Sequence, residues 1–276
     1  MIVVKPEGGL CNRMRVIDSC MSVKRYSLNN HTIKMIWELN PSLNCPFESL
    51  FEPIENIELV ATDPCISYFL YYKNRPVRRL RELVKKALYG FKSYNYQYFD
   101  DESLQEVAYD HNYWKNNKKD LVIKSCIDFY SPTIKNPEIF VPVPTLQQSI
   151  NKEIDKFINP TIGIHIRRTD SVKSIANSTT EMFLKKIEAS IKMDSNQLFY
   201  LATDDTKEEA LIISNFGELI ITQKNKDLDR NSTKGIQDAL VDLYSLSKTQ
   251  QIWGSYWSSF SKTAAGLNNI PLEIIG

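Results

Sequence analysis

The chain has 276 residues, of which 42% are hydrophobic and 24% are charged, and its formal net charge is +1 at pH 7. This composition predicts a globular protein of one large or two modest domains with a substantial core. Its near neutrality gives no indication of nucleic-acid or membrane binding through overall charge. No stretch reaches the ~20 apolar residues of a transmembrane helix. The N-terminal sequence becomes polar too early for a secretory signal peptide.

Cysteine usage indicates a reducing compartment. The five cysteines are odd in number and form neither a CxxC pair nor a cluster with histidine at zinc spacing: Cys11, Cys20, Cys45, Cys65 and Cys126. We interpret them as buried, reduced thiols. The expected location is therefore the cytoplasm. The richness in lysine, asparagine and isoleucine suggests a bacterial origin.

The first half of the chain mixes regular and irregular segments. A β-branched run at its start predicts a strand that ends at Pro6, and the following "EGG" predicts a loop. Further strands are expected at residues 32–39, 57–61 and 120–124, and helices at 10–28 and 76–91. Three prolines within residues 136–144 exclude a regular helix there and predict a linker.

The second half alternates regularly between strands and helices. Strands are expected at residues 161–166, 197–205, 218–223, 250–255 and 271–275, and helices at 179–192, 206–216, 235–248 and 258–267, the first of them with Thr179 as a helix cap. This alternation predicts a parallel sheet covered by helices on both faces, hence an α/β fold. We expect two domains, 1–145 and 146–276.

Three polar segments follow predicted strands in the second half: His165–Asp170, Thr203–Asp205 and Gly254–Ser261. Ligands of open parallel sheets bind beyond the carboxyl ends of the strands, where all three segments should meet. Arginines and a serine-rich helix start suit phosphate oxygens, and aspartates accept hydrogen bonds from ribose or purine groups. The alternatives are a surface ion pair of Arg167 and Arg168 with Asp170, and simple helix caps at Asp204–Asp205 and Ser258–Ser259.

The same segments carry a family resemblance. "GIHIRRTD", "FYLATDD" and "ALVDLYSLSKTQQIWGSYWSSFSKTAA", together with "GGLCNRMR" near the N-terminus, resemble the motifs of the GDP-fucose-dependent fucosyltransferase superfamily. That superfamily includes α1,2-, α1,6- and protein O-fucosyltransferases. The resemblance implies the GT-B architecture, with two Rossmann-like domains facing across a cleft. The N-terminal domain would lie on the acceptor side, and the C-terminal domain would bind the nucleotide sugar.

The resemblance also assigns roles to individual residues. Arg167 would bind the β-phosphate and stabilise the leaving diphosphate, while His165 would contact the guanine or its ribose. Asp242 would read the guanine edge. The remaining donor-site candidates are Arg168, Asp204, Asp205, Ser258 and Ser259 in the second half and Gly8, Gly9 and Asn12 in the first. No metal and no cofactor are implied, since arginine and a helix N-terminus replace the divalent cation of other glycosyltransferases.

Inversion at the anomeric carbon is also implied, and it requires a general base. Some family members have a lysine and a glutamate where this chain has Ser171 and Ile175, so the α1,6 linkage is not implied. Glu7, in the loop after the first strand, is our first candidate for the base, and Asp170 is the second.

Two further segments each allow two interpretations. Residues 73–92 carry eight basic residues on an apolar stripe. This pattern fits either an ordinary amphipathic helix or a contact with the inner face of a membrane. Residues 89–99 are rich in aromatic side chains, which fit either an acceptor subsite or core packing. The expected partners are a nucleotide-sugar donor and a glycan acceptor.

The activity best supported by the sequence is fucosyl transfer in the synthesis of a surface polysaccharide or glycan. Two alternatives stay open: the same scaffold with another nucleotide sugar, and a non-catalytic module that binds a nucleotide or glycan.

Overall fold

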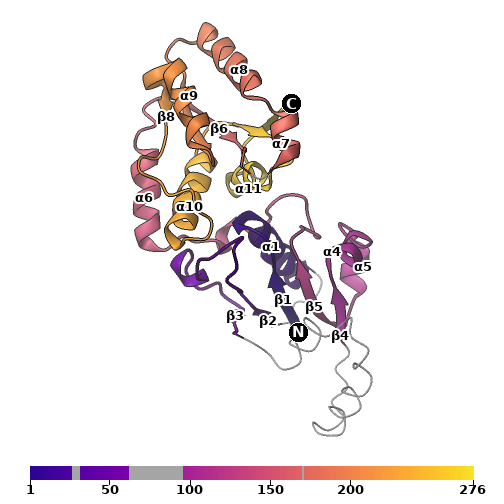
Figure 1. The fold of residues 1–276 in the computed structure, drawn as a ribbon. Helices are drawn as coiled ribbons and strands as arrows, with labels where there is room; N and C mark the ends of the chain where they lie inside the picture. The colour runs from indigo at the N-terminus through magenta and orange to yellow at the C-terminus, as the bar shows by residue number, and fades with distance from the viewer. Residues whose placement is uncertain (27–31, 62–95, 170) are drawn as a thin grey trace, which may run out of the picture. The chain divides into compact units, whose positions relative to one another are not determined.

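The computed structural model describes residues 1–26, 32–61, 96–169 and 171–276 (Figure 1). Cys65, Asp170, the expected helix at 76–91 and the basic segment 73–92 lie outside the described residues. Among the described cysteines, Cys11, Cys20 and Cys45 are buried and Cys126 is half-buried. No helix in the described ranges is both long and apolar enough to cross a membrane.

The chain divides into two compact units. Unit 1 contains Met1–Glu38 and Pro53–Asn136, and unit 2 contains Leu39–Glu52 and Pro137–Gly276. The division therefore falls at the start of the proline-rich segment, whereas the sequence suggested residue 145. The segment Leu39–Glu52 belongs to unit 2, where Phe51 pairs with Pro142.

Unit 1 is built on a five-stranded sheet in the order β3-β2-β1-β5-β4, and every pairing is parallel. The strands are β1 (Ile2–Pro6), β2 (Ile33–Met35), β3 (Ile57–Leu59), β4 (Tyr96–Phe99) and β5 (Asp120–Ser125). Its helices within the described ranges are α1 (Leu10–Tyr26), α4 (Asp101–Gln105) and α5 (His111–Asn116). Of the aromatic segment 89–99, the structure describes residues 96–99, which form β4. Phe99 in this strand is buried in the core.

Unit 2 contains a second five-stranded parallel sheet, in the order β10-β9-β6-β7-β8. Its strands are β6 (Thr161–Ile166), β7 (Leu198–Thr203), β8 (Ile220–Ile221), β9 (Ile252–Ser255) and β10 (Leu272–Ile275). Its α-helices are α6 (Pro144–Ile154), α7 (Val172–Asn177), α8 (Thr180–Met193), α9 (Thr206–Phe216), α10 (Thr233–Ser247) and α11 (Ser259–Asn268). Short 3-10 turns η1 (Phe47–Ser49), η2 (Pro137–Ile139) and η3 (Gly217–Leu219) complete it. The α/β fold expected from the alternation is confirmed.

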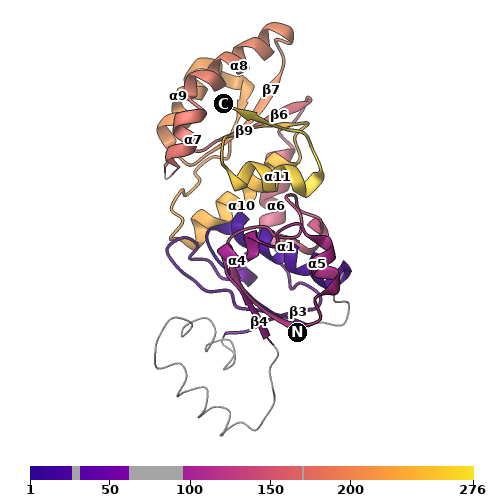
Figure 2. The ribbon, with the colours of Figure 1, turned by 90° about the vertical axis from the view of Figure 1, so that its right-hand side faces the viewer.

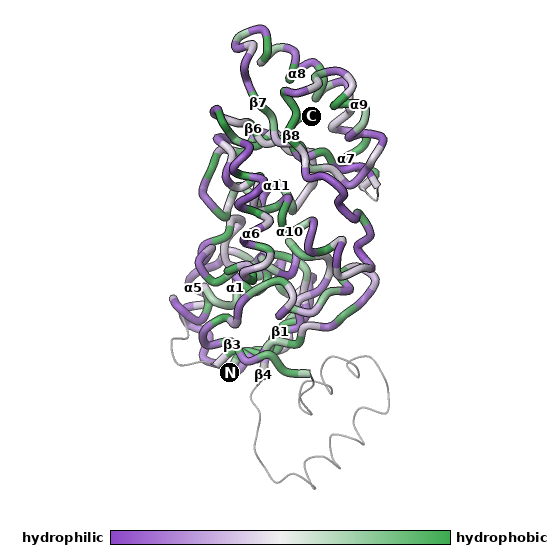
Figure 3. Tube along the Cα trace, turned by 90° about the vertical axis from the view of Figure 1, so that its left-hand side faces the viewer, coloured by the Kyte–Doolittle hydropathy of each residue, from purple (hydrophilic) through white to green (hydrophobic). Residues whose placement is uncertain are grey.

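Helices cover both faces of the unit 2 sheet (Figures 1 and 2). Ile162, Ile164 and Ile166 of β6 point to the face covered by α8 and α9, where they pack with Phe183 and Ile187 of α8. The alternate residues of β6 face α10 and α11. Every residue of β6 and β7 is buried, as expected for strands covered on both faces, and β7 is the more continuously hydrophobic of the two (Figure 3).

The differences from the predicted elements involve short or polar segments. The sequence did not suggest α4, α5, α6 or α7, and the strand expected at 32–39 is only three residues long. Thr179 occupies the N-cap position of α8 as predicted, but its hydroxyl makes no capping hydrogen bond.

Candidate functional site

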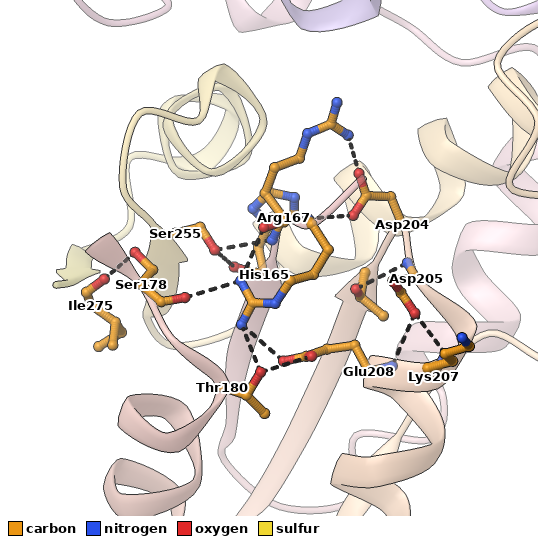
Figure 4. Close-up of polar contacts among 12 residues, drawn as sticks. His165, Arg167, Ser178, Thr180, Asp204, Asp205, Lys207, Glu208, Ser255 and Ile275 are labelled. Atoms are coloured by element: carbon orange, nitrogen blue, oxygen red, sulfur yellow. Dashed lines mark hydrogen bonds and ion pairs between the residues drawn. The ribbon is translucent and has the colours of Figure 1, made fainter. Parts of the chain in front are cut away.

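The carboxyl edge of the unit 2 sheet brings the three predicted polar segments together (Figure 4). β6 lies between β7 and β9, with His165 in register with Gly254 on one side and Ile166 in register with Thr203 on the other. The residues that follow these strands must therefore emerge side by side.

An ion pair joins the ends of β6 and β7. Arg167 Nη1 lies 2.5 Å from Asp204 Oδ2, and the hydroxyl of Thr169 donates to the same carboxylate oxygen at 2.6 Å. The backbone N–H of Arg168 donates to Asp204 Oδ1 at 2.8 Å. Burial alone raises the pKa of Asp204, but the Arg167 guanidinium and these hydrogen bonds lower it overall. The carboxylate therefore stays ionised and fixes the position of Arg167.

Ser255 joins the end of β6 to the end of β9. Its hydroxyl accepts from the N–H of Arg167 at 3.0 Å and donates to the carbonyl of His165 at 3.3 Å. Ser258, the N-cap of α11, follows three residues later, so their Cα atoms are at most about 11 Å apart. The Ser258 hydroxyl makes no capping hydrogen bond. An arginine and the positive end of a ten-residue helix thus meet at one edge, as anion binding requires.

His165 is held inside the site rather than at its surface. Only 5% of it is exposed, its Nδ1 lies 2.8 Å from the hydroxyl of Ser261, and its ring stacks on Phe260 at 4.7 Å. Burial lowers the pKa of His165 well below its ordinary value. The Asp204 carboxylate raises this pKa, whereas the positive charges of Arg167 and Arg168 lower it further. The imidazole is therefore neutral at pH 7 and suited to hydrogen bonding.

The buried His165 should make the protein less stable in mild acid. The unfolded chain gains a proton near pH 6.5 that the folded chain does not accept, so stability is lost as the pH falls below that value. We expect the free energy of unfolding to drop by about 1–2 kcal/mol between pH 7 and pH 5. Denaturant titrations at both pH values measure this drop. His165→Asn should abolish most of this drop in the free energy of unfolding. The control His111→Asn, at an exposed position in unit 1, should show the same drop as the wild type. An equal drop in His165→Asn would contradict the assignment.

Close packing at Gly254 sets the position of α11. A Cβ atom at this residue would lie 2.5 Å from Ser261 Oγ and 2.6 Å from Ser261 Cβ, so α11 would have to shift. We expect Gly254→Ala to destabilise the fold by about 1–3 kcal/mol, since overpacking of a tight core has this cost. Thermal denaturation measures this effect, and a wild-type melting temperature would contradict this account.

Arg168 and Asp205, both proposed from the sequence as donor-site residues, make structural contacts. The Arg168 guanidinium donates to Glu208 at 2.9 Å, to the carbonyl of Ser178 at 3.0 Å and to Thr180 at 3.2 Å. The Asp205 carboxylate caps α9 by accepting from the N–H groups of its first turn. These contacts hold the start of α8 and α9 beside the sheet edge.

Asp242 lies in a buried polar network that the sequence did not reveal. Its carboxylate accepts from the Tyr200 hydroxyl at 2.7 Å and lies 3.4 Å from Lys226 Nζ, which also contacts Glu209 at 2.7 Å. Burial raises the pKa of Asp242, although Lys226 and Tyr200 oppose this.

The candidates from the first half lie in unit 1, at the carboxyl end of β1. Gly8 has a φ of +75°, and a Cβ atom there would lie 2.7 Å from Asn12 Nδ2, so the turn requires glycine. The carbonyl of Gly9 accepts from the N–H of Arg13 at 3.1 Å. The Glu7 carboxylate is 38% exposed and lies 3.4 Å from Lys124 Nζ. It is therefore partly open to solvent, beside the Lys124 ammonium.

No group of three or more histidine, cysteine or acidic side chains suitable for a metal ion occurs among the residues that the structure describes.

Solved structures similar to this chain are fucosyltransferases. NodZ, an α-1,6-fucosyltransferase soaked with GDP-fucose, aligns with a TM-score of 0.64 and 15% identity over 96% of this chain and 91% of NodZ. FUT1 of Arabidopsis thaliana in complex with GDP aligns with a TM-score of 0.63 and 14% identity over 99% of this chain and 69% of that enzyme. POFUT1 in complex with GDP-fucose aligns with a TM-score of 0.59 and 11% identity over 100% of this chain and 98% of POFUT1.

This chain has the GT-B fold of the GDP-fucose-dependent fucosyltransferases. The resemblance inferred from four sequence motifs is thereby confirmed at the level of the fold. No protein-family profile and no curated protein sequence matches the chain.

Proposed function

We propose that the protein is an inverting fucosyltransferase that moves fucose from GDP-fucose to a glycan or polysaccharide acceptor. The supporting observation is the meeting of Arg167 and the start of α11 at one carboxyl edge of the unit 2 sheet. This arrangement suits a diphosphate, and the chain has the fold of enzymes solved with GDP and GDP-fucose. Unit 2 would then bind the donor, and unit 1 would contribute to the acceptor side.

The proposed reaction is a single displacement. The acceptor oxygen forms a bond to the anomeric carbon of fucose as the bond from that carbon to the β-phosphate oxygen breaks. The electron pair of the broken bond remains on GDP, and the acceptor proton passes to a base. Arg167 and the N–H groups at the start of α11 would stabilise the charge that develops on the diphosphate, so no divalent cation is needed.

Glu7 is our proposal for the base. Its carboxylate is open to solvent and belongs to the loop that follows β1 at the carboxyl edge of the unit 1 sheet. Lys124 Nζ lies 3.4 Å from it and leaves it partly exposed. Asp170 is the second candidate.

His165, Ser258 and Ser259 complete the proposed donor site, with Asp242 reading the guanine edge. The neutral imidazole of His165 would contact the base or ribose, and the two serines would bind phosphate oxygens. Gly8, Gly9 and Asn12 would approach the donor from unit 1.

The proposed setting is bacterial and cytoplasmic, with the basic segment 73–92 as a peripheral contact to the membrane. Co-sedimentation with liposomes tests this contact. Binding to anionic vesicles that is absent with neutral vesicles would support it.

A nucleotide panel tests the proposed function. In calorimetry, we expect binding of GDP and no binding of UDP at the same concentrations, with slow release of fucose from GDP-fucose. Addition of EDTA should change this release by less than twofold. Binding of UDP in preference to GDP would favour another donor on the same scaffold. GDP binding without any hydrolysis or transfer would favour a non-catalytic module.

A further inference from the structure

Two large aromatic side chains stand exposed immediately before α11. Trp257 is 66% exposed and Tyr256 is 39% exposed, and their ring centroids lie 6.1 Å apart. The ammonium group of Lys173, in α7, lies 4.3 Å from the centre of the Trp257 ring. An exposed tryptophan is uncommon, since burial of its large apolar surface is favourable.

The backbone that carries these rings is fixed. The N–H of Tyr256 donates to the hydroxyl of Ser178 at 2.7 Å, and the hydroxyl of Ser174 donates to the carbonyl of Tyr256 at 2.7 Å. Both serines are fully buried. Trp257 has a φ of +57°, a conformation that is strained for a bulky side chain. The fold thus holds an exposed tryptophan in a strained backbone conformation. Packing of the core does not require this tryptophan, because its ring is largely exposed.

Lys173 supplies a positive charge at the same place. Its side chain is exposed, and no carboxylate pairs with it in the described part of the chain. An ammonium over an indole ring is attracted by the negative face of the ring, so it is kept close to Trp257. The surface therefore combines an aromatic face with a positive charge.

We propose that Trp257, Tyr256 and Lys173 form a subsite for an anionic saccharide, which would be part of the acceptor. The apolar face of a sugar ring stacks on an aromatic ring because its C–H groups meet the negative π face. A carboxylate on the same sugar would pair with the Lys173 ammonium, and this charge complementarity favours an acidic glycan over a neutral one. The inference rests on the proposed function because it names the acceptor class.

Saccharide titrations followed by NMR test the subsite. The probes are hyaluronan tetrasaccharide, which carries carboxylates, and chitotetraose, which is neutral. We expect the wild-type protein to bind the acidic probe at least tenfold more tightly. Trp257→Asn should lose at least tenfold in affinity for the acidic probe while its melting temperature stays equal or rises, since asparagine tolerates a positive φ. Lys173→Gln should reduce the preference for the acidic probe to less than twofold.

Met193→Asn is the matched control, because Met193 is 88% exposed on α8 and has no part in the subsite. It should bind both probes as the wild type does. Equal binding of the two probes by the wild type, absence of binding, or full retention of binding in Trp257→Asn would overturn the proposal. GDP titration of the same variants separates the saccharide subsite from the proposed fucosyltransferase function. Loss of saccharide binding with GDP affinity unchanged within twofold supports the subsite, whereas a wild type that binds saccharide but not GDP contradicts only the proposed function.

Discussion

Replacing Arg167 by alanine should reduce fucosyl transfer about 100- to 1000-fold, the cost of removing one group that stabilises charge in a transition state. The guanidinium is held by the Asp204 carboxylate at 2.5 Å, at the edge where α11 begins. GDP affinity should also fall, because the same group would bind the diphosphate before the reaction. Steady-state kinetics and GDP calorimetry measure both effects.

Arg167→Lys refines this prediction. Lysine keeps the charge but lacks the planar fork of donors, so we expect about a tenfold loss of turnover. Lys192→Ala, which removes a positive charge from an exposed position on α8, should leave turnover unchanged. Wild-type turnover in Arg167→Ala would exclude the proposed role of this residue.

Replacing Glu7 by glutamine should reduce turnover at least ~100-fold while GDP affinity changes by less than twofold. Glutamine has nearly the same shape but cannot accept the proton of the acceptor hydroxyl. The contrast with Arg167→Ala is informative, because loss of a base affects the chemical step and leaves the donor site intact. Rate and affinity are measured on the same preparation.

Glu58→Gln is the control for charge, since Glu58 is an exposed acid on β3 of the same unit. It should retain wild-type turnover. If Glu7→Gln is as active as the wild type, Glu7 is not the base, and Asp170→Asn becomes the next variant to test.

The architecture of unit 2 was predictable because its strands and helices carry unambiguous patterns. β6 and β7 are apolar enough to be buried along their whole length, and each is followed by a polar segment and then a helix. Since carboxyl ends of parallel strands share one edge, the meeting of Arg167, Asp204 and Ser258 could be inferred before any coordinates.

The contacts that decide individual roles were not predictable. Arg167 and Arg168 are adjacent in the sequence, yet the first lies at the sheet edge and the second binds Glu208 behind it. Lys226 joins Asp242 only because the segment after β8 returns beside α10, which no local pattern indicates. The short helix α7 was missed since its six residues show no clear apolar periodicity. Such contacts depend on side-chain direction and on chain segments that are distant in sequence.

The most direct test is a crystal structure of the protein with GDP. We predict that the diphosphate lies at the carboxyl edge of the unit 2 sheet, with its oxygens about 3 Å from the Arg167 guanidinium and from backbone N–H groups at the start of α11. A structure in which GDP binds elsewhere, or in which only one of these two groups reaches the diphosphate, would contradict the account.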